Sequence, residues 1–175
     1  MPEIKKPSGK ILVIIFSSII LISASFLIFK IADKKRVIEG RNVFTSLEIT
    51  LPGNSTYIIT SSNQEDSFIL MFFNPDCYYC HVETEAILNH MDYFANVNIF
   101  MVTTSEPGTI INFENTYSLH DFPRIITGRI SEDAFWESYG IRTVPSLMIY
   151  NDKGSLLYSN SGYTPVSEII DVLSD

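Results

Sequence analysis

The feature that most constrains this chain is a run of six apolar residues that ends at a turn and is followed by two closely spaced cysteines. The run covers 68–73, the turn is Asn74-Pro75-Asp76, and the cysteines form the motif Cys77-Tyr78-Tyr79-Cys80. A short continuous apolar run is typical of a central strand buried on both faces of a sheet. From Cys77 to about Phe94, apolar residues recur at helical spacing. The sequence therefore predicts a buried strand that leads directly into a helix.

The rest of the chain after residue 43 predicts further strands and helices. In order, the expected elements are two short strands within 44–60 around the turn Pro52-Gly53-Asn54, a strand at 97–103, a helix at 106–119, an extended segment at 122–127, a helix from Ser131 to about Gly140, a strand at 146–150, a hairpin turn at 151–154, a returning strand at 155–159 and a last helix that starts at Thr164-Pro165. Strands that alternate with helices and then close in an antiparallel hairpin predict an α/β domain with a mixed sheet flanked by helices.

The N-terminal part of the chain contains nineteen uncharged residues, 11–29, most of them Ile, Leu, Val or Phe. A helix of this length spans roughly 28 Å, close to the thickness of a bilayer core. A buried helix of a soluble protein and a signal peptide cleaved near Ser23-Ala24-Ser25 are the alternatives. We favour an uncleaved transmembrane anchor because the apolar core of a signal peptide is usually about 7–15 residues. The expected organisation is a cytoplasmic segment 1–10, the anchor, a juxtamembrane linker 30–43 and a domain at 44–175.

Charge and cysteine content exclude several classes of protein. The net charge of −8 divides into +5 for residues 1–36 and −13 for residues 37–175. A domain this acidic is a poor ligand for polyphosphates, so no nucleic-acid partner is expected. Only two cysteines are present, which excludes a disulfide-stapled mini-domain and a zinc site built from cysteines alone.

The two cysteines are placed where their chemistry can be reversible. Unpaired N–H groups and the helix dipole at a helix start stabilise a thiolate, so we expect Cys77 to be exposed and to have a lowered pKa. Cys80 lies one turn on and is expected to be buried, within reach of the first sulfur. A structural disulfide, a metal site that also uses His81, and two unrelated buried cysteines remain as alternatives.

A second motif, Thr143-Val144-Pro145, directly precedes the strand predicted at 146–150. The simplest interpretation is a proline at a strand start, where no ladder hydrogen bond is lost. Together with the cysteine motif it has another interpretation. A cis Val144–Pro145 bond would bring Val144 close to the sulfurs and leave its backbone free to pair with an extended substrate segment.

With these motifs, the region from about Phe44 to Asp175 resembles the thioredoxin fold, and most closely the membrane-anchored, TlpA-like thiol–disulfide oxidoreductases of bacteria. The matching residues are 72–80, Glu83, 139–145 and 151–154, whereas 104–130 matches only in pattern. The departures are Phe73 and Asp76 where the family often has tryptophans, Met71 where thioredoxins proper have a buried acid, and Tyr78-Tyr79 where Gly-Pro or Glu-Pro is common between the cysteines.

The resemblance implies an enzyme that exchanges disulfides with partner proteins and needs no organic cofactor and no metal. Cys77 would be the nucleophile, Cys80 the resolving cysteine, Glu83 an acid/base for Cys80, and Val144 with Pro145 the docking site for the partner chain. It also implies a single-pass protein of the bacterial inner membrane, with a monomeric domain in the periplasm or outside the cell. The alternative is a metal-binding protein of the copper-chaperone type that uses the same cysteines.

Overall fold

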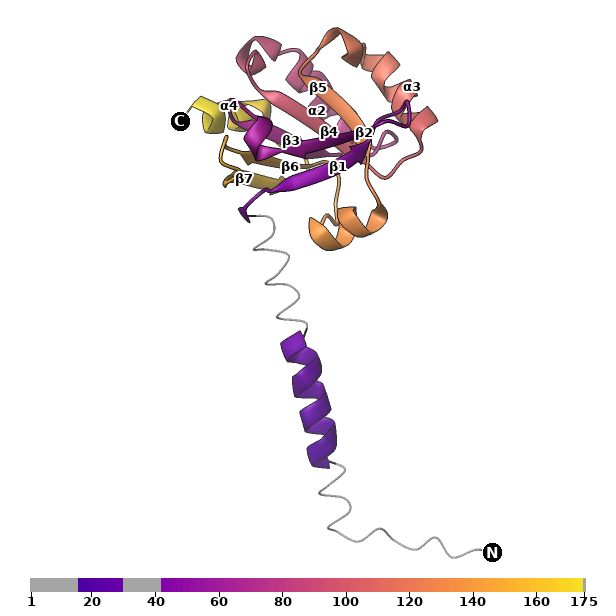
Figure 1. Ribbon diagram of the computed structural model, residues 1–175, viewed down its shortest axis with the longest axis vertical. Helices are drawn as coiled ribbons and strands as arrows, with labels where there is room; N and C mark the ends of the chain where they lie inside the picture. The colour runs from indigo at the N-terminus through magenta and orange to yellow at the C-terminus, as the bar shows by residue number, and fades with distance from the viewer. Residues whose placement is uncertain (1–15, 30–41, 175) are drawn as a thin grey trace, which may run out of the picture. The chain divides into compact units, whose positions relative to one another are not determined.

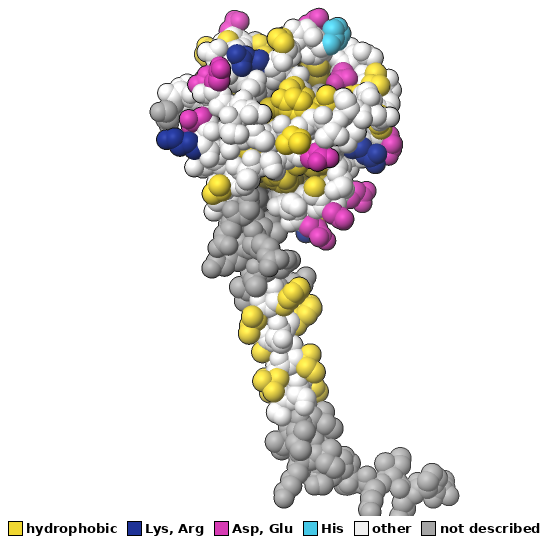
Figure 2. All heavy atoms as spheres, in the orientation of Figure 1, with side chains coloured by type: hydrophobic (Ala, Val, Ile, Leu, Met, Phe, Trp, Pro, Cys, Tyr) yellow, Lys and Arg dark blue, Asp and Glu magenta, His cyan; other side chains and the backbone are white. Residues whose placement is uncertain are grey.

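The computed structural model describes residues 16–29 and 42–174. The chain divides into two compact units, Met1–Ile38 and Glu39–Asp175. In the first unit, residues 16–29 are helical and their side chains are exposed (Figure 2). The predicted segment 1–10, the first part of the predicted anchor, and most of the predicted linker lie outside the described residues. Among the helices that are described, none is long and apolar enough to cross a membrane.

The second unit is built around one seven-stranded mixed sheet with the order β2-β1-β5-β4-β3-β6-β7 (Figure 1). The central strands β3, β4 and β5 are parallel, and the remaining neighbours pair antiparallel. The strands are β1 Ser46–Thr50, β2 Thr56–Thr60, β3 Phe68–Phe72, β4 Asn98–Thr103, β5 Ile125–Arg129, β6 Ser146–Tyr150 and β7 Leu156–Ser161. The predicted α/β class with a mixed sheet is confirmed.

Strand β3 has both faces buried, as its continuous apolar sequence predicts. Phe68, Leu70 and Phe72 belong to one core cluster, and Ile69 and Met71 belong to the other. This alternation follows from the two-residue period of a strand. The strand therefore separates two apolar cores, and other elements must pack on each face of the sheet to shield them from water.

Helices cover the second of these clusters. The helices are α2 Tyr78–Leu88, α3 Pro107–Tyr117 and α4 Val166–Ser174, and each contributes apolar side chains to the cluster that contains Met71. The other cluster is closed by the β1–β2 hairpin and by the segment that carries Phe135 and Tyr139. The sheet is thus flanked on both faces, and α2 leaves it directly at the end of β3.

Two predicted helices differ from the observed elements. α2 ends at Leu88 and not near Phe94, because His90 leaves the helical region (φ −125°, ψ 24°). A separate 3-10 turn, Met91–Phe94, then buries Phe94. The segment predicted as a helix from Ser131 is π-helical over Ala134–Ser138, with the Tyr139 N–H donating to the Ala134 carbonyl at 3.2 Å.

The extended segment predicted at 122–127 is displaced by about three residues in the structure. A 3-10 turn at Leu119–Asp121 follows α3, and strand β5 runs from Ile125 to Arg129. β5 pairs with β4 along its whole length but with β1 only at Thr50↔Arg129. The sheet therefore opens between β1 and β5.

Candidate active site

The turn between β3 and α2 sets the position of Cys77. The Asn74 side-chain Oδ1 accepts from the Asp76 N–H at 2.9 Å, and the Asn74 carbonyl accepts from the Cys77 N–H at 3.0 Å. Cys77 is the N-cap of α2, with extended backbone angles (φ −89°, ψ 117°). Asparagine and proline thus close the strand and place the thiol at the helix start.

The two thiols are free and lie one helical turn apart. The Cys77 Sγ accepts from the Cys80 N–H at 3.3 Å, so the sulfur itself caps α2. A helix N-terminus of this kind stabilises negative charge on the capping atom. Cys77 is partly accessible, whereas Cys80 is completely buried. The predicted burial of Cys80 is confirmed.

The environment of Cys80 keeps this thiol protonated. Burial is the main cause that raises its pKa far above the ordinary value, and the hydrogen bond with Cys77 and the negative charge of Glu83 act in the same direction. Removing a proton from Cys80 therefore requires an acceptor close by.

Glu83 is a carboxyl group placed to act as that acceptor. It lies three residues after Cys80, on the same face of α2, and is 0% exposed. Its Oε2 accepts from the Thr164 N–H at 3.2 Å, and its Oε1 has no hydrogen-bond partner among the described residues. Burial raises the pKa of Glu83 to about 7, although the Thr164 hydrogen bond opposes this. A carboxyl group that titrates near neutral pH can both take up and release a proton.

The loop before β6 contacts Cys77. The Val144–Pro145 bond is cis, as predicted. The Cys77 thiol donates to the Val144 carbonyl at 3.5 Å, although the two residues are 67 positions apart in the chain. The predicted site residues therefore lie close together at the end of β3: Cys77, Cys80, Glu83, Val144 and Pro145.

Aromatic side chains surround this place. Tyr78 and Tyr79 are 73% and 59% exposed, and Tyr163 is 39% exposed with its ring 6.5 Å from that of Tyr79. Exposed tyrosines present a large apolar area together with a hydroxyl group, which suits a contact surface for another protein. The surface at Cys77 is thus open and aromatic.

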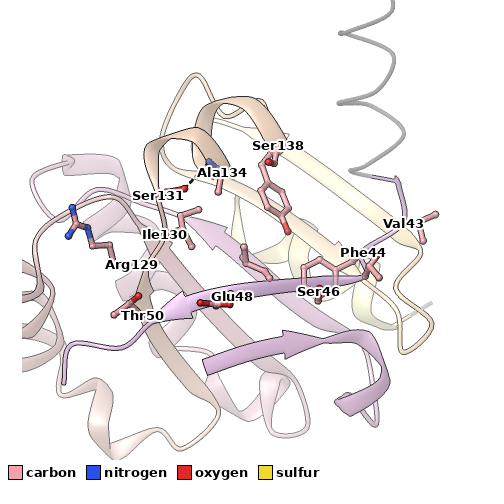
Figure 3. Close-up of a pocket in the computed structure, with 13 residues that line it drawn as sticks. Val43, Phe44, Ser46, Glu48, Thr50, Arg129, Ile130, Ser131, Ala134 and Ser138 are labelled. Carbon is pink, nitrogen blue, oxygen red and sulfur yellow. Dashed lines mark hydrogen bonds between the residues drawn. The ribbon is translucent and has the colours of Figure 1, made fainter. Parts of the chain in front are cut away.

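A pocket of about 790 Å³ lies elsewhere in the domain, where the sheet opens between β1 and β5 (Figure 3). Glu48 and Thr50 line one side, and Ile130, Ser131 and Ala134 line the other. None of the predicted site residues lines it. Cys77 therefore reaches the surface outside this pocket.

His81, which directly follows Cys80, is held inside the domain. It is partly buried, and both ring nitrogens are engaged, Nδ1 with the Tyr117 hydroxyl and Nε2 with the Pro75 carbonyl, each at 2.7 Å. Trp136 is 37% exposed, and the Arg142 guanidinium lies 5.9 Å from the centre of its ring. No local sequence signal identifies Tyr117 as the partner of His81, because it belongs to α3.

The described part of the chain contains no cluster of three or more metal-ligating side chains. Within residues 16–29 and 42–174, no three His, Cys, Asp or Glu side chains are grouped so as to hold an ion. His81 is not placed as a third ligand beside the cysteines, because its ring nitrogens are already hydrogen-bonded.

The sequence of the domain identifies its family. Residues 54–175 match the family described as a thioredoxin-like domain. The match covers more than half of the chain, and the protein belongs to this family. No curated protein matches the chain.

Solved structures of disulfide oxidoreductases share the fold. A secreted disulfide oxidoreductase of Mycobacterium tuberculosis, described as homologous to DsbE of E. coli, is 16% identical, with a TM-score of 0.61 over 78% of this chain and 97% of that one. StoA from Bacillus subtilis is 17% identical, with a TM-score of 0.58 over 75% and 98%. A thiol:disulfide interchange protein from Chlorobium tepidum is 11% identical, with a TM-score of 0.63 over 77% and 94%.

Proposed function

We propose that this protein is a membrane-tethered thiol–disulfide oxidoreductase that exchanges disulfides with partner proteins through Cys77 and Cys80. The observation that carries the proposal is the asymmetry of the pair. The partly accessible Cys77 sulfur caps α2 and contacts the Val144 carbonyl at 3.5 Å. The Cys80 thiol lies one helical turn further on and is fully buried. This arrangement separates the sulfur that meets the substrate from the sulfur that resolves the intermediate.

The exchange proceeds in two steps. The Cys77 thiolate attacks one sulfur of the substrate disulfide, forms a mixed disulfide and releases the other substrate sulfur as a thiolate. The Cys80 thiol then loses its proton to Glu83 and attacks the Cys77 sulfur. The Cys77–Cys80 disulfide forms, the bond between Cys77 and the substrate breaks, and the second substrate sulfur leaves as a thiolate. The substrate gains two electrons, which a thiol-bearing protein must later return to the enzyme; the same steps run in reverse for an oxidising role.

Val144 and Pro145 supply the docking edge for the partner. The Val144 carbonyl lies beside the Cys77 sulfur, so a segment that pairs with this backbone places its own disulfide at the nucleophile. Exposed Tyr78, Tyr79 and Tyr163 add apolar contact area around the sulfur. The chemistry uses protein thiols throughout and requires no organic cofactor.

The tether of this proposal is the apolar segment 11–29, in the manner of the TlpA-like oxidoreductases of bacteria. Residues 1–10 would lie in the cytoplasm, and the domain 44–175 would act as a monomer on the other side of the bacterial inner membrane. Nineteen consecutive uncharged residues and the need of a disulfide exchanger for an oxidising compartment support this placement. The Mycobacterium tuberculosis neighbour is itself described as secreted.

The proposal is tested by trapping the intermediate with oxidised glutathione. Wild-type protein should form the Cys77–Cys80 disulfide, and Cys80→Ser should accumulate a mixed disulfide at Cys77. Cys77→Ser is the matched control and should accumulate none, because Cys80 is buried. Mass spectrometry of the alkylated products measures all three. The proposal would be overturned if the wild-type protein remained a dithiol at every concentration of oxidised glutathione tested. It would also be overturned if both variants accumulated the mixed disulfide equally.

A further inference from the structure

His81 follows the second cysteine directly and is hydrogen-bonded through both its backbone and its ring. Its backbone N–H donates to the Cys77 carbonyl at 3.2 Å, as part of the first turn of α2. Its ring contacts the Pro75 carbonyl through Nε2 and the Tyr117 hydroxyl through Nδ1, both at 2.7 Å. The histidine therefore links the turn before Cys77, the start of α2 and the end of α3.

The partners of the ring define its tautomer. A carbonyl oxygen can only accept, so Nε2 carries the proton and donates to Pro75. In the neutral ring Nδ1 is then an acceptor. The Tyr117 hydroxyl donates to it at 2.7 Å, a shorter contact than the one that the same hydroxyl makes with the His81 backbone carbonyl at 3.5 Å. Burial, and then the negative charge of Glu85, raise the pKa of Tyr117, so its hydroxyl keeps the proton that this bond needs. Donor and acceptor match at both ring nitrogens.

Aromatic packing holds the pair in place. The His81 ring lies 5.1 Å from the ring of Phe113 and 5.6 Å from that of Tyr117. Phe113 in turn packs 4.8 Å from Phe73, the last apolar residue before the turn. A ring that is hydrogen-bonded at both nitrogens and packed against two other rings has little freedom to rotate.

This hydrogen-bonded pair acts on the backbone that carries the nucleophile. Pro75 is buried and lies two residues before Cys77, and the Cys77 N–H is bound to the neighbouring Asn74 carbonyl at 3.0 Å. With the Pro75 carbonyl fixed by His81, the turn is held at two successive peptides. The position of the Cys77 sulfur relative to the Cys80 N–H and Val144 depends on this turn.

We infer that His81 and Tyr117 are positioning residues for the exchange reaction: by holding the Pro75 carbonyl they keep the Cys77 sulfur in its attacking position. The inference rests on the proposed function and adds to it two residues that do not touch the substrate. Small displacements of a reacting atom can reduce a rate by a factor of ten or more, so the effect is expected in the rate of attack.

The experiment compares four variants of the full-length protein in their rate of reaction with oxidised glutathione. His81→Leu removes both hydrogen bonds and should slow mixed-disulfide formation by about tenfold. His81→Gln retains a donor near the Nε2 position and should restore the rate to within about threefold of wild type. Tyr117→Phe removes a single oxygen and should give an intermediate rate. His90→Leu is the matched control, since His90 is exposed and its ring nitrogen Nδ1 contacts the Ala86 carbonyl of α2, at the far end of that helix from its start.

Each outcome decides for or against the inference. The inference is overturned if His81→Leu reacts at the wild-type rate. It is also overturned if His81→Gln reacts as slowly as His81→Leu, because a role through the hydrogen bond to Pro75 requires that the glutamine restore the rate. If His81→Leu does not fold, as judged by circular dichroism, a wild-type rate for Tyr117→Phe overturns it. Failure of the wild-type protein itself to react with glutathione would instead overturn the proposed function, and the inference with it.

Discussion

Glu83 is a carboxyl group buried beside a buried thiol. Among the residues that the structure describes, its carboxyl group accepts one hydrogen bond, from the Thr164 N–H. Its pKa is raised from an ordinary value of 4.5 to about 7, chiefly by burial. A group with this property is well suited to proton transfer at neutral pH. Its ionisation while buried, however, lowers the free energy of unfolding.

The raised pKa of Glu83 in the folded protein predicts a specific pH dependence of stability. Between about pH 4.5 and 7 the folded protein binds a proton at Glu83 that the unfolded chain has released, so the free energy of unfolding falls as the pH rises. The loss is on the order of 3 kcal/mol and is complete above about pH 7. We expect Glu83→Gln to be more stable than wild type at pH 8 by an amount of this order, and the difference to shrink toward pH 4.5.

Urea denaturation of both proteins across this pH range measures the effect. Glu85→Gln is the control, because it changes an exposed carboxyl group on the same helix. It should leave the pH dependence of wild type unchanged in this range. A constant difference between Glu83→Gln and wild type from pH 4.5 to 8 would contradict the assignment of a raised pKa to Glu83.

At the scale of elements, the β6–β7 hairpin is joined to the start of β1. The turn is closed by the Asn151 side chain, whose Oδ1 accepts from the Lys153 and Ser155 N–H groups. Gly154 has a left-handed backbone (φ 78°), and its carbonyl accepts from the Phe44 N–H at 2.7 Å. Two segments at opposite ends of the domain sequence therefore meet at one glycine.

Gly154→Ala should destabilise the domain by about 2 kcal/mol or more. The left-handed backbone is unfavourable for alanine, and the added Cβ would be too close to the Phe44 carbonyl to be accommodated without movement. Gly53→Ala is the matched control, because a Cβ there meets nothing within 4 Å. Thermal denaturation of both variants measures the difference. Equal stabilities would show that the contact between the hairpin and β1 does not constrain the backbone of Gly154.

At the scale of the whole molecule, the chain separates into a basic, apolar N-terminal part and an acidic domain. Residues 1–36 carry a net charge of +5 and residues 37–175 carry −13. Positive residues flank the apolar segment on both sides, so charge alone does not orient it. The orientation we propose follows from the cysteine chemistry.

This orientation predicts the location of the C-terminus. Alkaline phosphatase, which folds only where disulfides form, should be active when fused after Asp175 in a bacterial host. A fusion that lacks residues 11–29 should be inactive, because the enzyme would remain in the cytoplasm. Activity of a cytoplasmic reporter alone in the full-length fusion would refute the proposed topology.

The sequence by itself determined those features that depend on neighbouring residues. The apolar run of β3 requires burial on both faces, and Asn74-Pro75-Asp76 ends it, so the placement of Cys77 at a helix start follows from local chemistry. The spacing of Cys77, Cys80 and Glu83 along one helix is likewise a local property. The hairpin turn at 151–154 and the strand at 146–150 were predictable for the same reason.

Only the tertiary structure decided the features that depend on distant segments. Thr164 binds a carboxylate 81 residues away, and Tyr117 meets His81 across 36 residues. Helical periodicity could not show that the backbone leaves the helical conformation at His90, with Phe94 buried by the turn that follows. Nor could it show that the segment at 134–138 is π-helical. Local patterns specify which face of an element is apolar, whereas the partner of each buried polar group is chosen by how the elements pack.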